Sequence, residues 1–268
     1  MRTLEGAALW AAVAGYALAF AALSAGTFLG RERLGRAGWR LAAAGWAAHT
    51  LAIAVRWIAT GHAPVQGAYE NSLSGAWFIP LLGGVLVRQY RPAIRAAPFI
   101  VAIALLLLGN GIMAPAVHLP LEPPFRSNWL VVHVAFAWLA FGSYLVASVL
   151  AGYHLWLSRR RAAVPAARPA VIDELSAKLI AFGFVGDTVM IASGAIWAHG
   201  LWGRYWAWDP IETWSLVSWL TYAVYLHLRF TLGWTGSRAA WLALGAAAVV
   251  VVTFFGIGVV SDVHTQLL

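Results

Sequence analysis

Long apolar runs separated by short polar clusters dominate this chain. The eight longest runs cover approximately 7–29, 39–59, 72–87, 96–114, 129–157, 176–198, 213–232 and 239–260. A helix that crosses a bilayer needs about 20 mostly apolar residues, and only helices and closed barrels can span lipid. The runs are continuous rather than alternating, which disfavours a transmembrane barrel. The pattern therefore predicts an all-α, polytopic membrane helical bundle with about eight transmembrane helices, forming a single domain over residues 1–268.

Composition narrows the class of protein further. Hydrophobic residues make up 62% of the 268 residues and charged residues 10%, against about 45–50% and 25% in soluble domains. So little charge cannot cover a soluble globule, and so many apolar residues exclude a disordered chain. The chain contains no cysteine, which excludes disulfides, thiolate metal sites and a cysteine nucleophile.

The basic residues predict an orientation in the membrane. One group of 14 of the 18 Lys and Arg residues lies beside alternate loops: Arg31, Arg33, Arg36, Arg40, Arg88, Arg91, Arg95, Arg159, Arg160, Arg161, Arg168, Lys178, Arg229 and Arg238. The positive-inside rule makes these loops cytoplasmic, so both termini and the loops at 60–71, 115–128 and 199–212 are predicted to be external. Topology thus accounts for the net charge of +8, and no nucleic-acid partner is expected.

This orientation sorts the ionisable side chains. Five of the eight histidines fall at the external face: His62, His118, His133, His199 and His264. His49 and His227 lie inside predicted spans, as does Asp187. A lone histidine is usually structural, but ionisable groups inside a membrane are costly and are functional candidates by default. Imidazole suits Fe, Cu and Zn, and it also serves as an axial ligand of haem.

Tryptophan is concentrated in one external segment. Residues 197–219 read WAHGLWGRYWAWDPIETWSLVSW and hold six of the 16 tryptophans. Asp209, Pro210 and Glu212 predict a capped helix start. An aromatic interface belt would spread its indoles over all helix ends, whereas a concentrated group favours a large, flat, apolar ligand.

The segment WGRYWAWDPIETW resembles the tryptophan-rich "WWD" signature of the haem-handling membrane proteins of cytochrome c maturation. WDPIETW is most similar to the CcsA (ResC) branch of the System II synthase. The same order of motifs is found in HTLAIAVRWIATGHAPVQGAYENSL, SNWLVVHV, YLHLR and FFGIGVVSDVHTQL. Together these segments extend the resemblance over most of the chain.

The resemblance implies roles for particular residues. His133 and His264 match two external axial ligands of haem iron, and His227 matches the histidine of an intramembrane haem site. The predicted platform for the haem ring consists of Trp202, Trp206, Trp208, Asp209, Tyr205 and Trp214. Arg204, Arg126 and Arg56 are external cations that could pair with haem propionates, or that could anchor the interface. The resemblance assigns no role to Asp187, for which a hydrogen bond inside the bundle is the simplest interpretation.

The resemblance also implies a function. Haem b, as a transported substrate, would move from the membrane to the external face for covalent attachment to the CXXCH thiols of apocytochrome c. A CcsB (ResB)-like protein would complete this haem lyase of the holocytochrome c synthase type, and a thiol-reducing partner could assist. The expected location is the bacterial inner membrane, with the WWD segment facing the periplasm. Two alternatives are a haem-delivery or export subunit without ligation activity, and a solute transporter; no catalytic residue is assigned.

Overall fold

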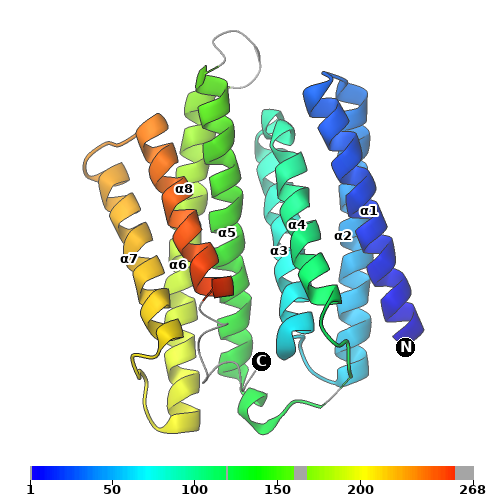
Figure 1. Ribbon diagram of the computed structural model, residues 1–268, viewed down its shortest axis with the longest axis vertical. Coiled ribbons are helices and arrows are strands. Elements are labelled where there is room, and N and C mark those ends of the chain that lie inside the picture. Colours follow the sequence, from blue (N-terminus) through cyan, green and yellow to red (C-terminus); the bar gives the residue numbers. More distant parts are fainter. Residues whose placement is uncertain (1, 119, 160–167, 257–268) are drawn as a thin grey trace. The chain divides into compact units, whose positions relative to one another are not determined.

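The computed structural model describes residues 2–118, 120–159 and 168–256 (Figure 1). Helices and turns make up these residues, with no strand among them. The α-helices are α1 (Arg2–Phe28), α2 (Glu32–Thr60), α3 (Gly67–Gln89), α4 (Ala97–Ile112), α5 (Asn128–Arg159), α6 (Pro169–Trp202), α7 (Pro210–Phe230) and α8 (Ser237–Val251). Two 3-10 turns, η1 (Arg91–Arg95) and η2 (Pro123–Phe125), and one π-helical turn, η3 (Val252–Gly256), complete the elements.

The helices confirm the all-α prediction, because each apolar run of the sequence falls on one of them. Five are long and apolar enough to cross a membrane by length and composition: α1, α2, α5, α6, and α8 together with η3. The 16-residue α4 is shorter. Two helices begin well before their apolar runs, α2 at Glu32 and α6 at Pro169. Backbone hydrogen bonding needs no apolar side chains, so both helices extend beyond their apolar runs.

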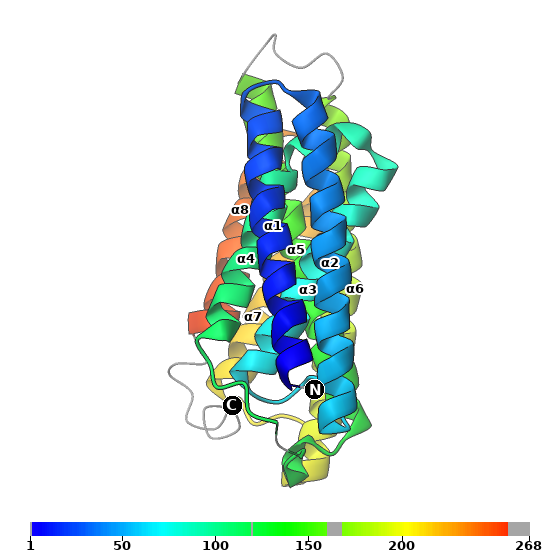
Figure 2. The same cartoon turned by 90° about the vertical axis from the view of Figure 1, so that its right-hand side faces the viewer.

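The described residues form two compact units, 1–126 and 127–268. Unit 1 holds α1 to α4, and α1 runs along α2 (Figure 2). Small residues allow these two helices to approach closely. A Cβ atom added to Gly15 of α1 would lie only 2.8 Å from the Cα of Gly45 in α2. A larger side chain at Gly15 would therefore push the two helices apart.

Unit 2 holds α5 to α8. Helix α5 packs along α6 and against α8, while α7 packs against α6 and α8. Aromatic side chains also join α5 to η3, where the rings of Phe141 and Phe254 stack with centroids 4.2 Å apart. The two helices α6 and α7 are joined by residues 203–209, so the tryptophan-rich segment forms one end of this unit.

Candidate functional site

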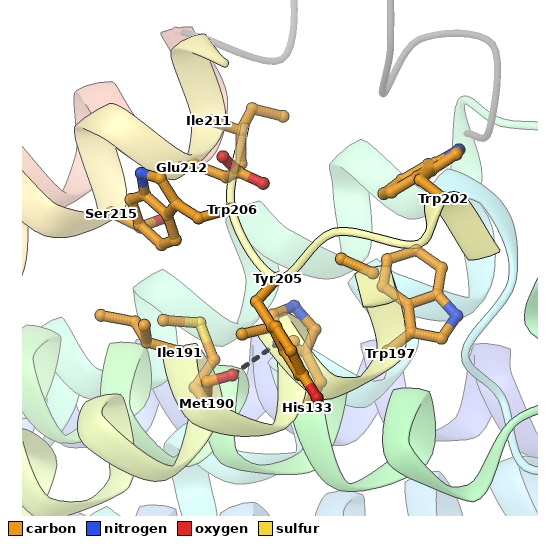
Figure 3. Close-up of a pocket in the computed structure, with 13 residues that line it drawn as sticks. His133, Met190, Ile191, Trp197, Trp202, Tyr205, Trp206, Ile211, Glu212 and Ser215 are labelled. Atoms are coloured by element: carbon orange, nitrogen blue, oxygen red, sulfur yellow. Dashed lines mark hydrogen bonds between the residues drawn. The ribbon is translucent and has the colours of Figure 1, made fainter. Parts of the chain in front are cut away.

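A hollow opens at the end of unit 2 that carries the tryptophan-rich segment (Figure 3). Its space, including the part open to solvent, is about 520 Å³. The lining residues are His133, Met190, Ile191, Gly194, Ala195, Trp197, Ala198, Trp202, Tyr205, Trp206, Ile211, Glu212 and Ser215. The ends of α5, α6 and α7 and the intervening loop thus converge on one aromatic-lined space.

His133 is held in this hollow by a backbone carbonyl of the neighbouring helix. Its Nδ1 lies 2.9 Å from the carbonyl oxygen of Met190, as the dashed line in Figure 3 marks. Because a carbonyl can only accept, Nδ1 carries the proton and the lone pair resides on Nε2. A histidine that ligates a metal is commonly fixed in this way. The geometry therefore suits His133 to ligation through Nε2.

Gly194 makes this position of His133 sterically feasible. A Cβ atom at Gly194 would lie 2.6 Å from His133 Nδ1, closer than real Cβ contacts come. Neither Gly194 nor Met190 was identified from the sequence, because nothing local distinguishes them from other residues of an apolar helix. Gly194 was the only sequence signal of the close contact with His133, and glycine is too common in membrane helices to single it out.

The loop that closes the hollow is shaped by its two helix ends. Gly203 ends α6 in the left-handed conformation with φ 69°, a common helix stop. Asp209 caps α7 as predicted, since its Oδ1 accepts from the backbone N–H of Glu212 at 2.8 Å. The Glu212 carboxylate accepts from Ala207 N–H at 2.6 Å, rather than from the N–H of the cap residue as in a standard capping box.

Trp208 has a positive φ of 60°, which is unusual for a bulky residue. The strained backbone sits immediately before the Asp209 cap, and the Trp208 indole is 68% exposed. Residues with such strained backbone angles persist only where the surrounding structure holds them, and they are found often at ligand sites. Trp208 packs edge-on against Trp206 with ring centroids 5.8 Å apart.

The structure brings some of the predicted platform together and leaves other members apart. Trp202, Tyr205 and Trp206 line the hollow with His133. Trp208, Asp209 and Trp214 are not part of its lining. The indole nitrogen of Trp206 is buried and has no hydrogen-bond partner among the described residues, so it is a donor available to a ligand.

The three predicted propionate contacts have different surroundings. Arg204 is exposed in the loop between α6 and α7. Arg126 is exposed in unit 1 and donates to the carbonyl of Leu121 at 2.9 Å. Arg56 is 2% exposed and lies in a buried ion-pair network of unit 1. A contact with a propionate stays a prediction, and Arg204 is the strongest candidate because it directly precedes Tyr205 of the lining.

We call this network the Arg56 cluster; it consists of Glu5, Arg56, Tyr69, Glu70 and His118. Arg56 Nε donates to Glu70 Oε1 at 2.7 Å and Nη1 donates to Glu5 Oε1 at 3.0 Å. Nη2 donates to the Val117 carbonyl at 2.9 Å. The Tyr69 hydroxyl and the His118 ring also bond Glu5. The arginine thus ties the ends of three helices to the segment that follows α4.

The remaining histidines fall into separate surroundings. The ring of His227 is exposed on α7, and no hydrogen bond links it to a described residue. His199 is also exposed and stacks on Tyr205 with centroids 4.2 Å apart. His62 is buried in unit 1. His264, the predicted second axial ligand, lies outside the described residues.

Across residues 2–118, 120–159 and 168–256, no three His, Cys, Asp or Glu side chains are grouped to hold a metal ion. Among these residues, His133 is the imidazole that lines the hollow, and aromatic side chains surround it. This arrangement fits a ligand that brings most of its own metal coordination, as a metallated macrocycle does.

Comparison with known proteins identifies the family of this chain. The sequence profile described as cytochrome C assembly protein matches residues 67–264. The cytochrome c biogenesis protein CcsA of Synechococcus sp. (strain RCC307) is 32% identical over 237 residues, covering 77% of this chain and 76% of the relative. CcsA of Guillardia theta is 32% identical over 238 residues, covering 78% and 77%. The chain belongs to the CcsA family of cytochrome c assembly proteins. Its long apolar helices agree with an integral membrane protein of this family.

The solved structure of another protein shares the fold of this CcsA-family chain. The cytochrome c heme lyase CcmF matches with a TM-score of 0.69 and 18% sequence identity. The match covers 99% of this chain, which spans half the length of CcmF. At this identity the likeness establishes the fold alone.

Proposed function

We propose that this chain binds haem b in the hollow of unit 2 and presents it for covalent attachment to the CXXCH thiols of apocytochrome c. His133 supplies one axial ligand through Nε2 and His264 supplies the other. A CcsB (ResB)-like partner completes the haem lyase. In this proposal the membrane is the bacterial inner membrane and the hollow faces the periplasm.

The observation that carries the proposal is the position of His133. Its ring is fixed by the Met190 carbonyl and shares the hollow with Trp202, Tyr205 and Trp206. Indole and phenol rings can pack on a porphyrin face, and an indole N–H can donate to a ligand. Arg204 directly precedes Tyr205 of the lining, and its guanidinium suits a carboxylate by its bidentate geometry. Haem supplies the iron and the vinyl groups; the protein supplies position and exclusion of water.

The test begins with the absorption spectrum of the purified protein. Co-purified haem with the spectrum of an iron bound by two histidines supports the proposal, and absence of haem supports the solute-transporter alternative. Incubation with an apocytochrome, with and without the CcsB-like partner, follows. Thioether formation distinguishes a synthase from a subunit that only delivers haem.

The aromatic lining should bind the ring by stacking. We expect Trp202→Ala and Trp206→Ala each to weaken haem binding roughly 2- to 10-fold, the worth of one aromatic contact. Phenylalanine at either position should cost less, because it keeps the apolar ring. Haem content of the purified variants measures the effect. Trp241→Ala is the control, because Trp241 is 57% exposed on α8 and does not line the hollow. Equal haem content in all these variants would contradict stacking.

His227 is proposed as a ligand of a separate haem site on the route from the membrane. It lies 18 residues after Asp209, about 27 Å along a helix at 1.5 Å per residue, so it cannot share an iron with His133. Its ring is exposed on unit 2 and has no hydrogen bond to a described residue. We infer that the CcsB-like partner provides the second imidazole of this site.

We expect His227→Ala to lower the haem content of the His133 site by about tenfold or more, although that site is itself intact. Tenfold is the lower end of the loss in affinity or activity that follows when residues supporting a metal site are changed. Added imidazole should restore part of the haem content. Val224→Ala is the matched control, since Val224 lies one turn earlier and is 52% exposed. Normal haem content in His227→Ala, measured by spectroscopy, would show that His227 serves no entry site.

A further inference from the structure

Unit 2 buries an acid that the proposed function does not use. Asp187 of α6 is 4% exposed. The hydroxyl of Tyr144, on α5, donates to Asp187 Oδ2 at 3.1 Å. The ring of Tyr222, on α7, stacks on Tyr144 with centroids 3.5 Å apart and planes 5° apart. Three helices thus each contribute one group to a buried cluster, which we call the Asp187 cluster.

The cluster lacks a compensating cation. No ion pair joins Asp187 to a basic side chain within the part of the chain that the structure describes. Helix α6 packs against α5 and α7, and the titratable groups that face Asp187 from them are Tyr144 and Tyr222. An unpaired carboxylate in so dry a place is costly. The neutral, protonated acid is therefore the stable form while no positive charge is nearby.

A second observation marks the cluster as incomplete. The Tyr222 hydroxyl is buried and has no hydrogen-bond partner among the described residues. Buried polar groups without a partner are rare, and each calls for an explanation. Acids inside transmembrane segments often mark ion pathways or proton relays.

The position of the cluster connects it with the hollow. Met190, whose carbonyl holds His133, follows Asp187 by three residues on α6, and Ile191 of the hollow follows it by four. At 1.5 Å per residue, Asp187 lies about 6 Å along the helix axis from Ile191. A charge change in the hollow therefore acts on Asp187 through a dry, poorly screening interior.

We propose that Asp187 is a proton-binding site that balances the charge of the iron held at His133. This inference rests on the proposed function. With haem bound, the Asp187 carboxylate would take up one proton when a one-electron reductant adds one electron to the ferric iron. It would release that proton when the electron leaves, and its negative charge would then stabilise the ferric state.

Redox titration of the haem-loaded protein across the neutral pH range tests the coupling. The wild-type midpoint potential should fall by about 59 mV per pH unit, the value for a tenfold change in a one-electron couple. In Asp187→Asn the potential should be nearly independent of pH. It should equal the wild-type value on the acid side and exceed it on the alkaline side, because the variant cannot supply the negative charge. Asp187→Glu should restore the slope.

Infrared spectroscopy of the haem-free protein provides a readout that needs no iron. Wild type should show a protonated carboxyl band that is missing from Asp187→Asn. Two results would show that Asp187 only forms a structural hydrogen bond. One is an infrared carboxyl region that is the same in wild type and Asp187→Asn. The other is a midpoint potential that depends on pH equally in the two proteins. A wild-type protein that binds no haem but shows the infrared band would instead overturn the proposed function, and the coupling with it.

Discussion

Replacing His133 with glycine is expected to abolish haem binding in the hollow and cytochrome c maturation with it. The loss should exceed the roughly 10- to 100-fold that follows when only the hydrogen-bond partner of a ligand is disturbed. Added imidazole should restore part of the haem, because it can occupy the space that the side chain leaves. Haem absorbance of the purified protein and yield of holocytochrome measure the two effects.

His154 provides a matched control for this replacement. It lies on the same helix, and its Nδ1 bonds the Pro169 carbonyl at 2.9 Å, much as His133 bonds Met190. Loss from α5 of a histidine that bonds a backbone carbonyl is thus common to both variants, whereas loss of a ligand is specific to His133. His264→Gly should behave as His133→Gly does if both ligate the same iron. Unchanged haem in His133→Gly would transfer the role to another histidine, such as His199, which stacks on Tyr205 of the lining.

A subtler variant tests the geometry around His133. Gly194→Ala should reduce haem binding by about 10- to 100-fold, because the new methyl group meets His133 Nδ1 and displaces the ring from Met190. Gly200→Ala is its control, since a Cβ atom there meets nothing within 4 Å. Equal haem content in the two variants, measured by absorbance, would mean that the His133 position is adaptable.

The second large effect is expected in unit 1. Arg56→Met should destabilise the protein by about 3–5 kcal/mol, the cost of breaking a buried ion pair. The methionine fills similar space, but it leaves the carboxylates of Glu5 and Glu70 buried without their guanidinium partner. Thermal unfolding followed by circular dichroism measures the loss.

Two companion variants separate charge from packing at Arg56. Arg204→Met removes an exposed arginine and should have little effect. The triple variant Glu5→Gln, Arg56→Met, Glu70→Gln should recover much of the stability, because no buried charge is left unpaired. If Arg56→Met unfolds at the same temperature as Arg204→Met, the Arg56 cluster does not stabilise unit 1.

The sequence by itself determined the helices and the local form of the tryptophan-rich segment. Apolar runs of sufficient length predict membrane helices because each residue's preference for hydrocarbon is local. The Asp209 cap was predictable for the same reason, since its partner lies three residues away. The motif resemblance pointed to His133, Trp202, Tyr205 and Trp206, which the structure places around one hollow.

Tertiary structure alone decided which groups meet across helices. His133 and Met190 are 57 residues apart in sequence, and Arg56 and Glu5 are 51 apart. Arg56 looked like an external cation from its place at the end of an apolar run, yet it lies buried between two acids. Asp187 was visible as an intramembrane acid, but its tyrosine partners were not. The rotation of each helix about its axis and the close approach of helices at glycines set such pairings. Lipid can cover any apolar face of a membrane helix, so the apolar pattern of the sequence does not determine that rotation.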